Sequence, residues 1–530
     1  MISIRNSSHW RGAGGIGKLL PIALPMMMSS LFDTAMMFVD RLYLSRLGKT
    51  EMSACMSGGS ACWTCMVFFV GLLAYSSAIV ARQYGAKNYS ECPRTTIQTL
   101  RLAFWTYPII LLLAVCVSRL FTSGSHEPLQ LQQELRYFWI CTIGCIFGLF
   151  RSPLASFFAG IGETAIIMWG NAVALVVNLV VNYMLIYGKW GCPAMGIDGA
   201  AVGTVASSFA MTAVLAWGII RKFRQSPWKS ERMFKPAPEV VKALLRFGYP
   251  SGLTGLLCSF SFTVVVIVYH GVSVDAAAAM TIVMSWELIS FLPMNGLQIG
   301  VTSLTSQRLG AQDTPEAERA VASGLKLALI YSTILSLAYL LLTPSLVRLF
   351  TGSDASLGYD SLIQTTSWMM RINCISVFFN GIYLIYSGGL QGGGDTFAAM
   401  LINVLFNWFT TFLAWFCLRP LHLDLIPTWL IWNLSYVTGI LPMWLRFRSG
   451  KWKHIKILTG DDGPAESRVH QVRDPRSESL KPEIRDPGSE SLKPEIRDPG
   501  SESLQPEIRD PGSESLKPEI RDPSPRPPFY

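Results

Sequence analysis

Residues 19–44 read LLPIALPMMMSSLFDTAMMFVDRLYL, a mainly apolar stretch that nevertheless contains two acids, Asp33 and Asp40. A helix of this length can cross a lipid bilayer. The two aspartates are seven residues apart, which is two helical turns, so their side chains share one face of the helix. A carboxylate at membrane depth is costly and marks an ion or substrate path. The alternative, an acid that snorkels to the interface, is easier for Asp40, near the end of the stretch, than for Asp33.

The composition places this stretch in a polytopic membrane protein. Hydrophobic residues make up 50% of the chain and charged residues only 15%, and the mean hydropathy is +0.36. Such values are typical of membrane proteins rather than of globular enzymes. We therefore predict an all-α fold with twelve transmembrane helices. The predicted spans are residues 19–44, 53–81, 99–121, 136–159, 165–187, 197–220, 243–270, 276–303, 325–350, 364–390, 397–418 and 426–446.

Lysine and arginine set the orientation of these spans. The loops after the second and sixth spans and the end of the twelfth span are rich in basic residues, whereas the loops after the fifth, seventh and eleventh spans are not. The positive-inside rule then predicts a multi-pass protein of the cell membrane with both termini in the cytoplasm. Topology and anionic headgroups account for the net charge of +9 without a nucleic-acid partner. No cleavable signal is expected, because the first apolar run is too long for a signal core.

The chain contains an internal duplication. Matched positions are Pro25 and Pro250, Gly71 and Gly296, and Gly85 and Gly310 at an offset of 225 residues, then Gly162 and Gly394, and Asn171 and Asn403, at an offset of 232. Each half carries six predicted spans, and an even number gives both halves the same orientation. We therefore predict two parallel six-helix bundles with a cavity between them.

Five segments follow from this organisation. They are a cytoplasmic N-terminal segment (1–18), a first bundle (19–220), a basic cytoplasmic linker (221–242), a second bundle (243–447) and a cytoplasmic tail (448–530). The tail repeats the sequence DPxSESLxPEIR every twelve residues from Asp474 onward. Its closely spaced prolines oppose helix formation and its apolar content is too low for a core, so the tail is predicted to be disordered.

Several motifs stand in the order of a known family. They are LLPIALP at 19–25, FVD ending at Asp40, ARQYGAKN at 81–88, FFAGIGETAIIMWGNAVALVVNLVVNYMLIYG at 157–188, GIDGAAVGT at 196–204 and LQGGGDT at 390–396. On these residues the chain resembles the multidrug and toxic compound extrusion (MATE) transporters over roughly residues 15–447, nearly everything except the tail. The resemblance implies an antiporter that expels organic cations or other amphipathic compounds in exchange for inward Na⁺ or H⁺.

The resemblance also implies a cation-coupling site in the first bundle. The family's motif positions fall on Asp40, Asn178, Asn182 and Thr204, with Asn182 standing where many relatives have aspartate. Asp33 is a further candidate on the same helix face as Asp40. Amide, hydroxyl and carboxylate oxygens suit Na⁺, and they equally suit a cage around a protonatable acid. The alternative is that the two asparagines, four residues apart on one face, only join helices through hydrogen bonds.

The second bundle departs from some relatives, which have acids in the seventh and tenth spans. The aligned residues here are Cys258 and Asn380. Glu287, in the eighth span, is the remaining deep acid of this half. We predict that Glu287 and its neighbour Trp286 line the substrate cavity, because an acid among aromatic rings attracts a cationic amphipathic substrate. The alternative is a buried glutamic acid hydrogen-bonded to a neighbouring helix.

Pro25 lies in the first span and removes a backbone hydrogen bond there. In the family the matching proline lets the first helix bend, so Pro25 is a candidate bending point. A static kink, satisfied by neighbouring helices, is the equal alternative. Most of the eleven cysteines lie inside spans, where cysteine acts as a small hydrophobic residue. No metal site is therefore expected beyond a possible Na⁺ at Asp40, Asn178, Asn182 and Thr204.

Three classes of function compete for this sequence. A secondary active antiporter is favoured, and the runner-up is a lipid-linked precursor or polysaccharide flippase of the same superfamily. The flippase would need a strongly cationic cavity, whereas most lysines and arginines lie in the cytoplasmic loops. A membrane enzyme is disfavoured because the sequence has no P-loop, no H-E-x-x-H and no G-x-S-x-G motif. We expect no cofactor, a small-molecule substrate, the bilayer as surroundings, and a monomer driven by a Na⁺ or H⁺ gradient.

Overall fold

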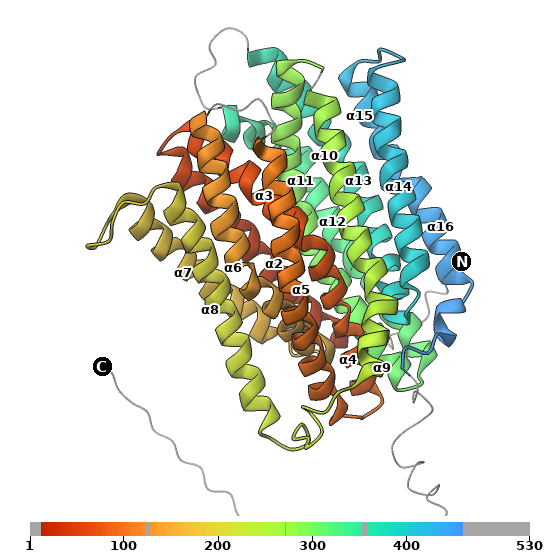
Figure 1. Ribbon diagram of the computed structural model, residues 1–530. Helices are drawn as coiled ribbons and strands as arrows, with labels where there is room; N and C mark the ends of the chain where they lie inside the picture. The colour runs from red at the N-terminus through yellow and green to blue at the C-terminus, as the bar shows by residue number, and fades with distance from the viewer. Residues whose placement is uncertain (1–11, 123–127, 271, 352–358, 459–530) are drawn as a thin grey trace, which may run out of the picture. The chain divides into compact units, whose positions relative to one another are not determined.

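The structure, a computed structural model, describes residues 12–122, 128–270, 272–351 and 359–458 (Figure 1). These ranges are almost entirely helical and contain no β-strand. The first half, bundle 1, forms α2 (Ile16–Ser45), α3 (Lys49–Ala74), α4 (Ser76–Gly85), α5 (Glu91–Thr122), α6 (Pro128–Ile161), α7 (Ala165–Tyr187) and α8 (Ile197–Phe223).

The second half, bundle 2, follows a connection of residues 224–237, which contains the basic residues Arg224, Lys229, Arg232 and Lys235. It forms α9 (Pro238–Ala243), the π-helical turn η1 (Leu244–Gly248), α10 (Tyr249–His270), α11 (Val274–Gly310), α12 (Thr314–Thr351), α13 (Tyr359–Gly393), α14 (Thr396–Leu418), α15 (Leu425–Leu434) and α16 (Tyr436–Arg448). A short 3-10 turn, η2 (Lys451–His454), comes after α16.

Each of the twelve predicted spans falls on one helix or on consecutive helices, so the all-α membrane fold is confirmed. Among the described residues, ten spans are long and apolar enough to cross a membrane. The two predicted spans outside these ten are the eighth, α11, and the twelfth, which a break at Ser435 divides into α15 and α16.

The two bundles pair their helices in the same way. In bundle 1, α7 packs against α2 and α8, while α6 packs against α3 and α5. In bundle 2, α14 packs against α10, and α13 packs against α11 and α12. The pairing is equivalent because, by the sequence offsets, α2 corresponds to α10, α7 to α14 and α6 to α13.

The duplication is also seen in a reciprocal close contact between α4 of bundle 1 and α11 of bundle 2. A Cβ atom on Gly85 of α4 would lie 1.9 Å from the backbone oxygen of Gln307 in α11. Reciprocally, a Cβ atom on Gly310 would lie 2.1 Å from the backbone oxygen of Arg82. Gly85 and Gly310 are 225 residues apart, and so are their contact partners, Arg82 and Gln307. Glycine is therefore needed at both positions because the helices approach too closely for a side chain.

The bundles pack together around the N-terminal half of α2. Leu19 and Ala23 of this helix belong to one buried apolar cluster with Leu297 and Val301 of α11. At the other end of α2, Leu44 belongs to a cluster formed only by residues of bundle 1. The half of α2 that carries Asp40 therefore lies outside the shared core.

The segment after α16 differs from the prediction, which began a disordered tail at residue 448. Trp452 is completely buried, stacks on Phe447, and donates its indole N–H to the Phe447 carbonyl at 2.8 Å. Arg82 of bundle 1 donates to the backbone oxygen of Ile455 at 2.6 Å. Apolar residues among the basic ones thus hold residues 449–458 against the bundles. The twelve-residue repeats, and the N-terminal residues 1–11, lie outside the described residues.

Candidate functional site

Asp40 and Asn182 join α2 to α7. The Asn182 amide Nδ2 donates to Asp40 Oδ1 at 2.5 Å. Asn178, one turn earlier on α7, is completely buried beside this contact, and neither of its side-chain polar atoms has a hydrogen-bond partner among the described residues. A buried amide without partners is costly in a folded protein. The Asn178 amide therefore keeps hydrogen-bonding capacity beside the Asp40 carboxylate.

Thr204 adds a third helix to this group. Its hydroxyl donates to the Ala200 carbonyl of its own helix at 3.1 Å. Thr204 and Asn178 both lie close to the Asp40 carboxylate. The structure thus brings Asp40, Asn178, Asn182 and Thr204 together at one place inside bundle 1. Their oxygens could surround a small cation or share a proton.

Gly203 makes this meeting of α7 and α8 possible, and the sequence analysis did not identify it. A Cβ atom at this position would lie 1.8 Å from Asn182 Oδ1. Any side chain would push Asn182 away from Asp40 or separate the two helices. The signal in the sequence was the glycine directly before Thr204 in the motif GIDGAAVGT.

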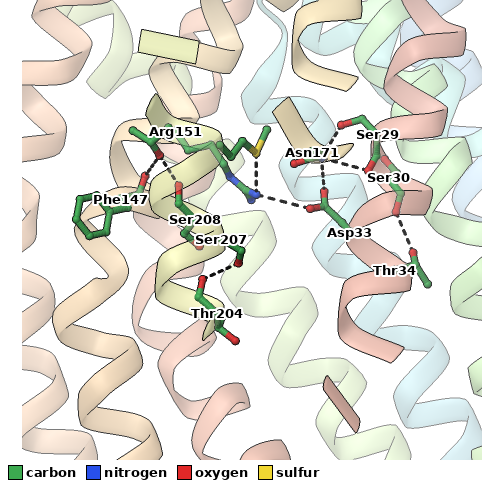
Figure 2. Close-up of polar contacts among 12 residues, drawn as sticks. Ser29, Ser30, Asp33, Thr34, Phe147, Arg151, Asn171, Thr204, Ser207 and Ser208 are labelled. Atoms are coloured by element: carbon green, nitrogen blue, oxygen red, sulfur yellow. Dashed lines mark hydrogen bonds and ion pairs between the residues drawn. The ribbon is translucent and has the colours of Figure 1, made fainter. Parts of the chain in front are cut away.

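Asp33 does not join the Asp40 group, although we predicted it as part of that site. Its Oδ2 accepts a hydrogen bond from Asn171 of α7 at 3.0 Å, and its Oδ1 lies 3.6 Å from Arg151 Nη1 of α6. Figure 2 shows Arg151 reaching toward Asp33 from one side while Asn171 holds the carboxylate from another. Seven residues of helix separate Asp33 from Asp40 by roughly 10 Å along the axis, which explains why a shared face is not a shared site.

Arg151 is a functional candidate that the sequence analysis missed. Its signal was a lone arginine within a predicted span, in the stretch FGLFRSPL. Besides Asp33, the guanidinium contacts the sulfur of Met211 at 3.4 Å. Intramembrane arginines are costly and face a bundle interior, so they mark function by default.

Glu287 of α11 borders a small cavity in bundle 2. The cavity has a volume of about 10 Å³, space for about one water molecule. It is lined by Glu287, Ser290, Phe291, Met294, Ser376, Val377, Asn380 and Gly381. Glu287 Oε2 is buried and has no hydrogen-bond partner among the described residues. Asn380, noted above as replacing an acid of some relatives, thus lies in the same cavity as Glu287.

Trp286 occupies a different place from Glu287. It is not among the residues that line the cavity, and its side chain packs against the apolar core of bundle 2. Its backbone oxygen accepts hydrogen bonds from the hydroxyls of Tyr339, at 2.8 Å, and Ser290, at 3.0 Å. Of the two residues predicted to line the cavity, only Glu287 does so. Phe291, and not Trp286, is the aromatic residue that lines it with Glu287.

Pro25 lies inside an uninterrupted α2, as does Pro21. A proline at position 25 cannot donate the helical hydrogen bond to the carbonyl of Pro21. Thr164, buried at the start of α7, supplies one donor instead: its hydroxyl lies 2.8 Å from the carbonyl oxygen of Ile22 and 3.3 Å from that of Pro21. A neighbouring helix thus satisfies the backbone around Pro25 in this conformation. The bending role of Pro25 stays a prediction.

Comparison with known proteins agrees with this architecture. A family model described as MatE matches residues 25–184 and 250–416, more than half of the chain and parts of both bundles. The "Probable multidrug resistance protein NorM" of Thermotoga maritima is 22% identical over 444 residues, which cover 83% of this chain and 94% of the relative. The "Multidrug resistance protein MdtK" of Yersinia pseudotuberculosis is 24% identical over 392 residues, covering 74% and 84%.

Solved structures show the same fold. A MATE protein in complex with MaL6 has a TM-score of 0.76 at 20% identity and covers 85% of this chain and 100% of its own. An outward-facing multidrug resistance MATE transporter of the MOP superfamily has a TM-score of 0.76 at 19% identity, covering 84% and 99%. With the family model matching both bundles in their duplicated order, the chain belongs to the MATE family of multi-pass membrane transporters, a family of multidrug efflux proteins.

Proposed function

We propose that the protein is a secondary active antiporter, which exports organic cations or other amphipathic compounds in exchange for inward Na⁺ or H⁺. Membership of a multidrug efflux family and the convergence of polar groups on Asp40 support this proposal. The flippase alternative gains no support from Arg151 inside bundle 1, because the Asp33 carboxylate 3.6 Å away offsets its charge.

The observation that carries the proposal is the difference between the two acids of α2. Asp33 has Arg151 as a cationic partner. Asp40 has an amide hydrogen bond from Asn182 but, within the described residues, no cation in ion-pair contact; the exposed Arg41 acts on it only from further away. A carboxylate without a contacting cation at membrane depth favours the binding of a cation or a proton. Asp40 is therefore the acid that loads the coupling ion.

The coupling site occurs once per chain. The duplication maps Asp40 to Val265, Asn178 to Thr410 and Asn182 to Ala414 in bundle 2. None of these residues can carry a negative charge. Each transport cycle would therefore use a single ion site in bundle 1, whereas the substrate can contact both bundles.

The arrangement of the bundles suits alternating access. They pack together near the N-terminal half of α2, the side of the basic loops, and they share no core around Leu44. With the basic loops in the cytoplasm, this conformation would be closed to the cytoplasm and would present Asp40 to the outside. An ion can drive the cycle only if its affinity for Asp40 differs between the two conformations.

The test is export of a fluorescent organic cation from vesicles that contain the full-length protein, with Na⁺ and H⁺ gradients imposed separately. We expect one gradient to drive export, and we expect Asp40→Asn to abolish that dependence while the protein still folds. Glu163→Gln is the matched control, because Glu163 is an exposed acid paired with Lys222 at the end of bundle 1. Gradient-driven export that persists in Asp40→Asn would refute the site, and wild-type protein that exports under neither gradient would refute the antiporter.

A further inference from the structure

Three helices of bundle 1 converge on a second polar site, which is distinct from the Asp40 group. Asp33 of α2, Arg151 of α6 and Asn171 of α7 form it (Figure 2). Asn171 also donates to the hydroxyl oxygen of Ser29 at 2.6 Å. The carboxylate, the guanidinium and the amide therefore face one another from separate helices.

This site is only partly satisfied by the protein itself. The Arg151 nitrogen is 3.6 Å from Asp33 Oδ1, too far for a direct hydrogen bond, and the other contact of the guanidinium is the weak acceptor sulfur of Met211. The side chains of Arg151 and Asp33 keep 34% and 37% of their surface exposed. Asn171 is only 3% exposed, yet its Oδ1 has no partner among the described residues. Guanidinium donors and an amide acceptor thus remain available to a bound molecule.

The duplication argues that this ion pair is not required to hold the helices together. Asp33, Arg151 and Asn171 correspond to Cys258, Tyr383 and Asn403 in bundle 2. There the Tyr383 hydroxyl donates to Asn403 Oδ1, so a neutral hydrogen bond takes the place of the charged cluster. The same three-helix junction is therefore built without charges in the other half of the molecule.

We propose that Asp33 and Arg151 form a recognition site for zwitterionic amphipathic substrates, which carry both a carboxylate and a positively charged nitrogen. This rests on the proposed export function and names the substrate class that bundle 1 selects. Arg151 would bind the substrate carboxylate, since guanidinium matches carboxylate geometry. Asp33, held by Asn171, would bind the cationic group.

The preference for zwitterions over cations follows from the opposite charges of Asp33 and Arg151. A purely cationic substrate that binds Asp33 must draw it away from Arg151, and the guanidinium is then left unpaired in a low-dielectric site, which is unfavourable. A zwitterion replaces both partners at once and leaves no charge unpaired. The pair therefore penalises permanent cations relative to zwitterions of the same shape, which is specificity by rejection as well as by attraction.

The test uses two dyes that differ in one carboxyl group, the zwitterion rhodamine B and its cationic ethyl ester. Binding of each to the purified full-length protein in nanodiscs is measured by fluorescence anisotropy, so the result does not depend on transport. We expect the wild type to prefer the zwitterion. In Arg151→Gln we expect the ratio of the two Kd values to shift by about tenfold toward the ester. Arg151→Lys, which keeps the charge, should restore part of the preference.

Two further variants separate recognition from a structural role. Tyr383→Phe removes the equivalent neutral contact in bundle 2 and should leave the ratio unchanged. The exchange Asp33→Arg with Arg151→Asp restores opposite charges and should recover the preference for the zwitterion. A Kd ratio in Arg151→Gln within about twofold of the wild-type ratio would overturn the proposal, even if both affinities fall. Absence of export with selective binding intact would instead count against the antiporter alone.

Discussion

At the residue scale, the absence of a side chain at Gly203 determines the geometry of the candidate ion site. Replacement by alanine would place a methyl group 1.8 Å from Asn182 Oδ1, so either the amide leaves Asp40 or α8 moves away from α7. We expect Gly203→Ala to lower gradient-driven export by about tenfold or more, the effect of losing roughly 1.4 kcal/mol of stabilisation. Initial export rates in vesicles, normalised to the amount of folded protein, measure this.

Gly170→Ala is the matched control for this substitution. Gly170 lies at the same α7–α8 interface, but a Cβ atom there would be 3.5 Å from the Met211 side chain, an ordinary contact. The control should export at nearly the wild-type rate. Equal rates in Gly203→Ala and the wild type would show that close approach of α8 to Asn182 is not needed.

A second prediction concerns the Pro21 carbonyl, which Pro25 leaves without its helical donor. Thr164→Val keeps the side-chain shape but removes the hydroxyl, whose single proton is shared between the Ile22 and Pro21 carbonyls. Leaving a buried acceptor unpaired costs about 1–3 kcal/mol, so the variant should unfold at a lower temperature in detergent. Pro25→Ala restores a backbone N–H at this turn. The loss caused by Thr164→Val should therefore be smaller in a Pro25→Ala background, and an equal loss in both backgrounds would contradict the pairing.

The sequence was informative about the residues of one polar site and not about the other. Asp40, Asn178, Asn182 and Thr204 were placed together because family motifs carry them, and the structure brings them together. Asp33 was assigned to the same site because a seven-residue spacing gives a shared face. Periodicity says nothing about depth in the membrane or about a partner that reaches across from α6, so the pair with Arg151 could not be predicted.

At the scale of elements, the segment after α16 is a structural part of the transporter. Trp452 is fully buried, and a Cβ atom on Gly393 would lie 2.8 Å from its ring, so the indole is enclosed by the end of α13. We expect Trp452→Ala to destabilise the protein by about 3–5 kcal/mol, the usual cost of removing a large buried side chain. Thermal unfolding in detergent measures this loss.

Trp105→Ala is the comparison for that loss, because Trp105 of α5 is 70% exposed in the isolated chain and faces outward from the bundle. Its replacement should change stability far less. Equal changes in the two variants would mean that the segment at 449–458 contributes little to the fold. Basic residues dominate the local composition here, which favours a tail, and burial of one tryptophan against a helix end has no periodic signal.

At the scale of the whole molecule, the duplication predicted two parallel six-helix bundles. It could not predict at which end of the helices the bundles share a core, because repeat offsets do not report contacts between the bundles. The structure resolves this through close contacts such as Gly300 with Ala23, which the drifting offsets alone do not reveal. Divergence between the halves is equally informative, since Asp40 in one becomes Val265 in the other.

The shared core gives the last prediction, which concerns movement of one bundle against the other. A Cβ atom on Gly300 of α11 would lie 3.1 Å from the Cβ atom of Ala23 in α2. This is slightly shorter than the spacing of about 3.5–4.5 Å in disulfides, so Ala23→Cys with Gly300→Cys should cross-link on oxidation after a small shift. If the bundles separate here during transport, the cross-link should stop export, and a reductant should restore it. The two single-cysteine variants retain the same eleven native cysteines and should export under both conditions. Full export by the cross-linked protein would mean that α2 and α11 stay together throughout the cycle and that access alternates by a motion within the bundles.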